Sequence, residues 1–185
     1  MKNVVIVAAR ILKWFYAYEA INILFRILPS KYIISILSYF GANIGKGIRI
    51  QSPFIIHNAD QKTPIYSNLS IGDGCYIGRD CIFDLMGKIT IGQKVTISHR
   101  AVLNTHTNAG NSPLTNGLLI ISSGNIEIND GVYLGSNTTI LENVKIGKEV
   151  IIGSKSLVNT NVPDRVTAFG IPCKVNKKNN SSNDN

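Results

Sequence analysis

At 185 residues, the chain is long enough for one compact domain with short flanking segments. Its formal net charge of +8 suits a phosphate-bearing ligand or an anionic membrane surface. No stretch interleaves basic and aromatic residues on one surface, so nucleic acid is the weaker interpretation of this charge and is not among the predicted partners.

The chain begins with an apolar segment, residues 1–43. Residues 4–28 predict one helix that Pro29 ends, and residues 32–40 predict a second, shorter helix. Arg10 and Lys13 interrupt the first apolar run, which argues against a signal peptide and a membrane-spanning helix. The segment caps the exposed end of the β-structure that follows, lies in a membrane interface as a peripheral contact through residues 4–28, or does both.

A six-residue repeat occupies residues 44–165. Its clearest run of aliphatic positions is Ile128, Leu134, Ile140, Ile146, Ile152 and Val158, each followed four residues later by a small or β-branched residue. Each unit fits one short strand plus a corner, and three units make a triangular turn of about 18 residues. The pattern predicts an all-β solenoid, the parallel β-helix of hexapeptide repeats. A β-sandwich is a poorer fit, because sandwich strands alternate at period two with variable spacing.

Glycines and cysteines recur at fixed places in the repeat. Glycine follows the aliphatic residue at Gly45, Gly72, Gly78, Gly92, Gly135, Gly147 and Gly153. We expect these glycines to supply corner φ values that residues with a Cβ resist. Cys75 and Cys81 occupy the small position, which predicts buried thiols rather than metal ligands or a disulfide. The odd count of three cysteines indicates a reducing compartment.

The repeat breaks in three places. It slips by two residues around Asp84, and the polar residues 58–68 predict an excursion. Residues 107–120 are rich in turn formers and predict a loop that leaves the solenoid, directly after His106. An imidazole with an unperturbed pKa of about 6.5 suits proton transfer from a hydroxyl. The last segment, residues 166–185, ends in a polar tail that we expect to be disordered from Lys177.

Several motifs in order carry a family resemblance. The repeat, the Thr-His element at His106, the loop, and the ending Val162-Pro163 to Gly170-Ile-Pro-Cys-Lys174-Val resemble the hexapeptide-repeat acetyltransferases. The chain looks similar to galactoside and maltose acetyltransferases, and above all to O-acetyltransferases of polysaccharide and lipopolysaccharide gene clusters. Those also begin with an apolar helical segment and a Phe-Gly-Ala-x-Ile-Gly junction, here at residues 40–45. The resemblance covers nearly all of residues 30–177. It implies a left-handed solenoid and a homotrimer with active sites between subunits.

The resemblance also implies an activity. It predicts acetyl transfer from acetyl-CoA to a sugar hydroxyl in bacterial surface polysaccharide biosynthesis, in the cytoplasm or peripherally at the inner face of the membrane, without a metal. His106 matches the family's general base, and the acceptor attacks the thioester directly. Asp84 and Asn104 match the acceptor side. Asp84 either binds a sugar hydroxyl or orients the imidazole.

Cofactor-binding positions carry over in the same way. They are Tyr133, Ser136, Ser154, Lys155, Asn159, Thr160, Lys174 and Lys177. Two of these depart from the family pattern. Thr160 replaces a lysine, which removes a charge near the nucleotide phosphates, and Lys155 replaces a small residue and is placed to restore that charge.

Three alternatives stay open. The acceptor could be an amino sugar, although N-acetyltransferases commonly carry a nucleotide-binding domain that is absent here. A γ-type carbonic anhydrase would use His57, His99 and His106 as zinc ligands at about 2.0–2.1 Å, and their spacing gives no reason to converge. A non-catalytic scaffold is the third. The saccharide acceptor itself is either free or lipid-linked.

Overall fold

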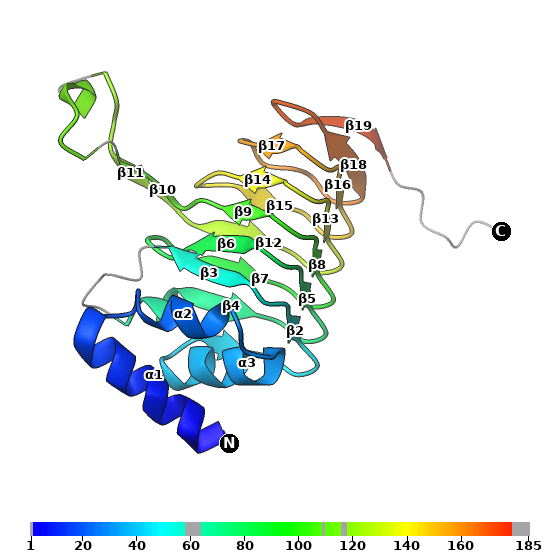
Figure 1. Ribbon diagram of the computed structural model, residues 1–185. Helices are drawn as coiled ribbons and strands as arrows, with labels where there is room; N and C mark the ends of the chain where they lie inside the picture. The colour runs from blue at the N-terminus through cyan, green and yellow to red at the C-terminus, as the bar shows by residue number, and fades with distance from the viewer. Residues whose placement is uncertain (1, 58–63, 109, 116–117, 179–185) are drawn as a thin grey trace.

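The computed structural model describes residues 2–57, 64–108, 110–115 and 118–178, with helices at one end of a stack of β-coils (Figure 1). The predicted helix over residues 4–28 is wrong in one respect, because it is two helices. Ala17 has a φ of 49°, and this turn lets the second helix fold back so that Ile21 and Phe25 reach the core. The helices are α1 (Lys2–Tyr16), α2 (Ile21–Phe25) and α3 (Ser30–Tyr39).

The β-coils follow the repeat. Successive strands visit three sheets in turn, so that each parallel sheet collects every third strand of the stack. Sheet A contains β1 (Asn43–Ile44), β4 (Leu69–Ile71), β7 (Ile89–Ile91), β12 (Ile126–Ile128) and β15 (Lys145–Ile146). Sheet B contains β2 (Arg49–Ile50), β5 (Tyr76–Ile77), β8 (Thr96–Ile97), β13 (Tyr133–Leu134), β16 (Ile151–Ile152), β18 (Val166–Phe169) and β19 (Lys174–Lys178). Sheet C contains β3 (Phe54–His57), β6 (Cys81–Asp84), β9 (Val102–Leu103), β14 (Thr139–Ile140) and β17 (Leu157–Val158).

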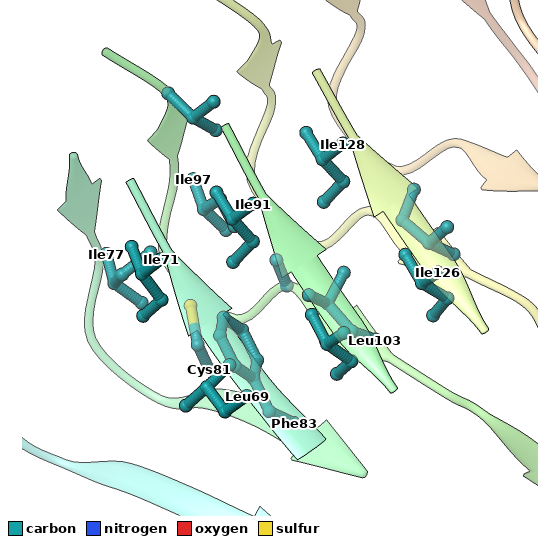
Figure 2. Close-up of a cluster of buried hydrophobic side chains, with 14 of the residues drawn as sticks. Leu69, Ile71, Ile77, Cys81, Phe83, Ile91, Ile97, Leu103, Ile126 and Ile128 are labelled. Atoms are coloured by element: carbon teal, nitrogen blue, oxygen red, sulfur yellow. The ribbon is translucent and has the colours of Figure 1, made fainter. Parts of the chain in front are cut away.

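The core is the predicted aliphatic column. Ile128, Leu134 and the four repeat positions after them are at most 1% exposed. The side chains of neighbouring coils point into the same interior from different sheets (Figure 2). Complete burial of one such aliphatic side chain contributes about 1.5–3 kcal/mol, so the stack is stabilised by a column rather than by a single cluster.

The glycines have a different role from the one predicted. None of the seven that follow an aliphatic residue has a positive φ, and the left-handed corner positions are held by residues such as Asn137 and Lys155. At Gly135 a Cβ would lie 2.5 Å from the amide nitrogen of Ser154 in the next coil. Glycine is therefore required by the close approach of stacked backbones rather than by an unusual φ.

The helical segment pairs with the open edge of the first coil. The Asn22 side chain donates to the Ile56 carbonyl at 2.9 Å and accepts from the Ile56 amide at 3.0 Å. Ser30 Oγ accepts a hydrogen bond from the amide of Ile50 at 2.8 Å. These side chains occupy the place of a neighbouring strand and satisfy backbone groups that would otherwise be unpaired.

At the other end of the stack, β19 pairs antiparallel with β18. Lys177 pairs with Thr167 in this ribbon, so the prediction of disorder from Lys177 onward is wrong for Lys177 and Lys178. The rest of the predicted tail, residues 179–185, lies outside the described residues. No helix in the described ranges combines the length and the apolar character that crossing a bilayer requires.

Candidate active site

Two corners border sheet C. The first corner lies between sheets B and C and is formed by residues that directly follow the strands of sheet B: Gly78, Ser98, Gly135 and Gly153. Each of their amides donates a hydrogen bond to a carbonyl of the sheet B strand in the next coil. We call it the glycine corner. The second follows sheet C and contains Asp84, Thr105 and His106; we call it the histidine corner.

Asp84 and His106 meet at the histidine corner. Asp84 ends β6, and His106 begins β10 (His106–Thr107) one coil later. His106 Nδ1 lies 2.6 Å from Asp84 Oδ2, and their side chains are 14% and 1% exposed. Asp84 follows the buried repeat position Phe83 at the point where the repeat slips, and its buried carboxylate contacts His106.

The Asp84 carboxylate is held by further donors. The Thr105 amide donates to Oδ2 at 2.8 Å, and the Met86 amide donates to Oδ1 at 3.1 Å. Thr105 Oγ1 lies 2.9 Å from Oδ2 and accepts a hydrogen bond from the Gly87 amide. Backbone donors of this kind stabilise an ionised carboxylate in a buried site.

The pair defines which imidazole nitrogen acts. A carboxylate can only accept hydrogen bonds, so His106 Nδ1 carries the proton that faces Asp84 and the lone pair belongs to Nε2. Nε2 is then the basic atom. Of the two roles that the sequence left open for Asp84, the geometry matches orientation of the imidazole. Asn104 donates from Nδ2 to the His106 carbonyl at 3.0 Å and so braces the backbone of the same residue.

Sequence reasoning missed His57. It ends β3 rather than belonging to the excursion, and it pairs in register with Asp84. Its ring stacks on that of His106, with centroids 5.9 Å apart and planes 22° from parallel. The repeat contained the information to place His57, since Ile56 is a repeat position and the residue after it lies at the histidine corner. The nine residues beyond a regular 18-residue turn between His57 and Asp84 concealed the register.

The predicted loop leaves the stack at His106 (Figure 1). β10 pairs antiparallel with β11 (Ser122–Ser123), which closes the base of the loop. Thr107 Oγ1 and Ser122 Oγ donate to the same Glu142 oxygen, at 3.2 and 2.9 Å. A short 3₁₀ helix at Pro113–Thr115 lies within the loop.

The predicted cofactor residues divide between two edges. Ser136, Ser154 and Lys155 lie at the glycine corner, and Tyr133 is beside it on the outer face of β13, with its hydroxyl 3.2 Å from Ser98 Oγ. Asn159 and Thr160 follow β17 and therefore lie on the edge that carries the histidine corner. The two remaining predicted residues, Lys174 and Lys177, are exposed on β19.

The three histidines do not converge. His99 is at the glycine corner, where its Nδ1 lies 3.3 Å from Ser136 Oγ, whereas His57 and His106 are across sheet C. Among the described residues, no group of three His, Cys, Asp or Glu side chains has a geometry that could hold a metal. Cys75 and Cys81 are buried as predicted, and burial raises the pKa of the Cys81 thiol to about 11.

Comparisons with known proteins agree with this architecture. A family model described as bacterial transferase hexapeptide (six repeats) matches residues 125–160. The chain is 29% identical over 149 residues to a galactoside O-acetyltransferase of Lactococcus lactis, covering 80% of this chain and 69% of the relative. A putative lipopolysaccharide biosynthesis O-acetyl transferase of Escherichia coli K12 is 28% identical over 148 residues, covering 76% and 71%.

A solved structure shows the same fold. It is a hexapeptide-repeat acetyltransferase of Vibrio cholerae complexed with acetyl-CoA, with a TM-score of 0.73, 20% identity and coverage of 87% and 84% of the two chains. The chain carries the hexapeptide repeat of bacterial transferases and is similar over most of its length to acetyltransferases of this repeat class. These findings support an enzyme of the acyltransferase class.

Proposed function

We propose that the protein is an acetyl-CoA-dependent O-acetyltransferase that acetylates a sugar hydroxyl in bacterial surface polysaccharide biosynthesis. The observation that carries the proposal is the Asp84–His106 pair, a base held in one tautomer beside an open loop. The named relatives that act on galactosides and on lipopolysaccharide support a saccharide acceptor. Residues 44–165 form the catalytic unit in this proposal, flanked by residues 1–43 and 166–185.

In the proposed mechanism, His106 carries the proton from the acceptor to the leaving thiolate. His106 takes the acceptor's hydroxyl proton at Nε2 while the oxygen attacks the acetyl carbonyl, and it returns that proton to sulfur as the carbon–sulfur bond breaks. Asp84 stabilises the imidazolium that exists between these two transfers. A general base of this kind contributes on the order of 10²- to 10⁴-fold to the rate.

The glycine corner has the chemistry to hold the donor. The Ser136 amide is the proposed hydrogen-bond donor to the oxyanion, and Ser154 the contact of the next coil. Lys155, Lys174 and Lys177 are exposed cations suited to the phosphates of coenzyme A. Tyr133 is 44% exposed on the adjacent strand, which leaves its ring open to the pantetheine arm. Asn159 and Thr160 are on the other edge of sheet C, so the proposal places them against the donor of a different subunit.

This division supports a homotrimer of left-handed coils. His99 and His106 mark the two corners and are seven residues apart, so at about 3.3 Å per residue the corners are separated by on the order of 20 Å. The outer face of sheet C between them carries a ladder of partly exposed residues that is mostly apolar: Ile55, Ile82, Val102, Thr139 and Leu157. Covering this face with a second copy would bring the histidine corner of one subunit to the glycine corner of the next.

A peripheral membrane contact through residues 4–28 is part of the proposal. α1 exposes an apolar stripe at helical spacing: Val4, Val7, Ile11 and Trp14, exposed by 70%, 51%, 52% and 80%. Lys2 and Arg10 flank the stripe, and α1 contains no acidic residue. This combination suits the interface of an anionic bilayer, where a lipid-linked saccharide at the cytoplasmic face would be the acceptor.

Release of coenzyme A from acetyl-CoA tests the activity. Purified wild type and His106→Ala would be compared with mono- and oligosaccharides and with an amino sugar, after correction for hydrolysis. We expect release that depends on a hydroxyl acceptor and is lost in the variant. Transfer to the amino sugar alone would show that the acceptor atom is nitrogen rather than oxygen. A trimeric protein that releases no coenzyme A with free or lipid-linked acceptors would indicate a non-catalytic scaffold.

Trp14 gives a direct test of membrane contact, because it is the chain's single tryptophan. We expect its emission to shift to shorter wavelength with vesicles containing phosphatidylglycerol and to stay unchanged with phosphatidylcholine alone. Val7→Glu with Ile11→Glu should remove the shift. A shift that depends on protein concentration without vesicles would instead show that a second copy covers the stripe.

A further inference from the structure

His57 is an exposed histidine whose ring contacts that of His106, the proposed catalytic base. It lies at the histidine corner one coil before Asp84, at the end of β3, and its ring covers one face of His106. A stack with centroids 5.9 Å apart is within the range of favourable offset ring pairs. The acceptor must therefore approach His106 from the other face or from the edge that carries Nε2.

The nitrogens of His57 have no partner among the described residues. Within the described ranges, no hydrogen bond to either ring nitrogen is formed, and the residue is exposed. His99, the other exposed histidine, differs because its Nδ1 is near Ser136 Oγ. A neutral imidazole offers one donor and one acceptor, which is the pair of functions that a hydroxyl can match.

The residues predicted on the acceptor side are engaged elsewhere. Asp84 is 1% exposed and binds His106, Thr105 and Met86. Asn104 uses its amide group on the His106 carbonyl. Asp84 is buried and Asn104 is partly exposed, whereas His57 is exposed, so a saccharide that enters this corner can reach His57.

We propose that His57 binds the acceptor through a hydroxyl neighbouring the one that is acetylated, and that its ring holds the His106 imidazole in the reactive orientation. This inference rests on the proposed O-acetyltransferase activity. It assigns two separable contributions to one side chain. The hydrogen bond acts on acceptor affinity and on the choice of hydroxyl, and the stack acts on the rate through His106.

Two variants separate these contributions. His57→Phe keeps a flat ring and loses the nitrogens, so the KM for the acceptor should rise about 10-fold, the value of one hydrogen bond to a ligand. Its kcat should change by less than about threefold. His57→Gln keeps a hydrogen-bonding group and loses the stack, so kcat should fall while the acceptor KM stays near that of wild type.

Acceptors that lack single hydroxyls identify the contact. Wild type should lose about 10-fold in kcat/KM with the analogue that lacks the neighbouring hydroxyl, and His57→Phe should lose little further with the same analogue. Tyr39→Phe is the matched control, since it removes a polar group from an exposed ring on α3, outside both corners, and should leave the acceptor response unaltered. The KM for acetyl-CoA should not change in His57→Phe.

The outcomes separate the inference from the function on which it rests. If wild type is active and His57→Phe has the same acceptor KM and the same response to the analogues, the role of His57 is overturned and the proposed activity stands. Equal losses of kcat and acceptor affinity in all His57 variants, with no change in analogue pattern, would show a purely structural residue. A wild type without acceptor-dependent release would overturn both.

Discussion

The two corners of sheet C are built on opposite principles. At the glycine corner the repeat is regular, and small residues let the coils stack so closely that a Cβ at Gly135 would meet the amide of the next coil. At the histidine corner the repeat slips, and Asp84, Thr105 and His106 fill the irregular space with hydrogen bonds. The regular corner presents a row of backbone groups and short side chains, whereas the irregular corner holds one specific side-chain pair.

The largest effect should follow from His106→Ala. Loss of the base at the irregular corner should lower kcat by on the order of 10²- to 10⁴-fold, because no other described side chain at that corner presents a basic nitrogen in a fixed tautomer. Steady-state release of coenzyme A measures it. Unchanged circular dichroism and oligomeric state would show that the loss is chemical, and a rate near that of wild type would remove His106 from the mechanism.

Asp84→Asn should also lower kcat, by up to on the order of 10⁴-fold and by no more than His106→Ala does. The amide keeps the size of the side chain but can present a donor to Nδ1, which favours the tautomer with the proton on Nε2. The measurement is kcat at saturating acceptor. A rise in acceptor KM with unchanged kcat would contradict this prediction and return Asp84 to a role in binding the sugar.

Mixing variants tests whether the corners cooperate between subunits. His106→Ala and Ser136→Trp each disable one corner, and both should be nearly inactive alone. After joint unfolding and refolding at equal amounts, about a quarter of the sites would combine two intact corners if neighbouring subunits share a site. Recovery of activity in the mixture, absent when each variant is refolded alone, supports sharing. A mixture as inactive as its components places both corners of a site in one chain.

The face between the corners should control assembly. Val102→Glu puts a charge in the apolar ladder of sheet C, and we expect it to shift the proposed trimer to monomer in size-exclusion chromatography with light scattering. Thr90→Glu is the matched control, since Thr90 is also partly exposed but lies on sheet A. Dissociation by both variants, or by neither, would remove sheet C as the specific interface.

The smallest expected effect is the change in the free energy of unfolding with pH that comes from Cys81, next to the glycine corner. Burial raises the pKa of Cys81 from 9.0 to about 11, so the unfolded chain releases this proton at a lower pH than the folded protein. The thiol's contribution is complete below pH 9 and is lost as pH rises toward 11, by up to about 3 kcal/mol. Denaturant titrations at pH 8 and pH 10.5 should show a smaller alkaline loss for Cys81→Ala than for wild type. An equal loss in both would assign it to other groups.

Regular features of the molecule could be predicted from the sequence, and irregular ones could not. The positions of the buried column followed from Ile128 to Val158 because one period fixes every strand. The partner of His106 and the position of His57 depend on register across insertions of unequal length, which spacing alone does not give. The break at Ala17 was likewise hidden, because an apolar run does not show where a helix must turn to bury Ile21 and Phe25.

Asn22 ends the hydrogen-bonded pairing at the first coil of sheet C as well as satisfying the backbone groups of that edge. Its side-chain amide reproduces both hydrogen bonds of a peptide unit and then stops, because a side chain has no further strand to offer. Replacing it by Leu would leave Ile56 presenting an unpaired amide and carbonyl at the end of sheet C. An unpaired end of this kind is a template for strand pairing with another molecule, and Asn22, together with Ser30 and the helices over the first coil, blocks such pairing.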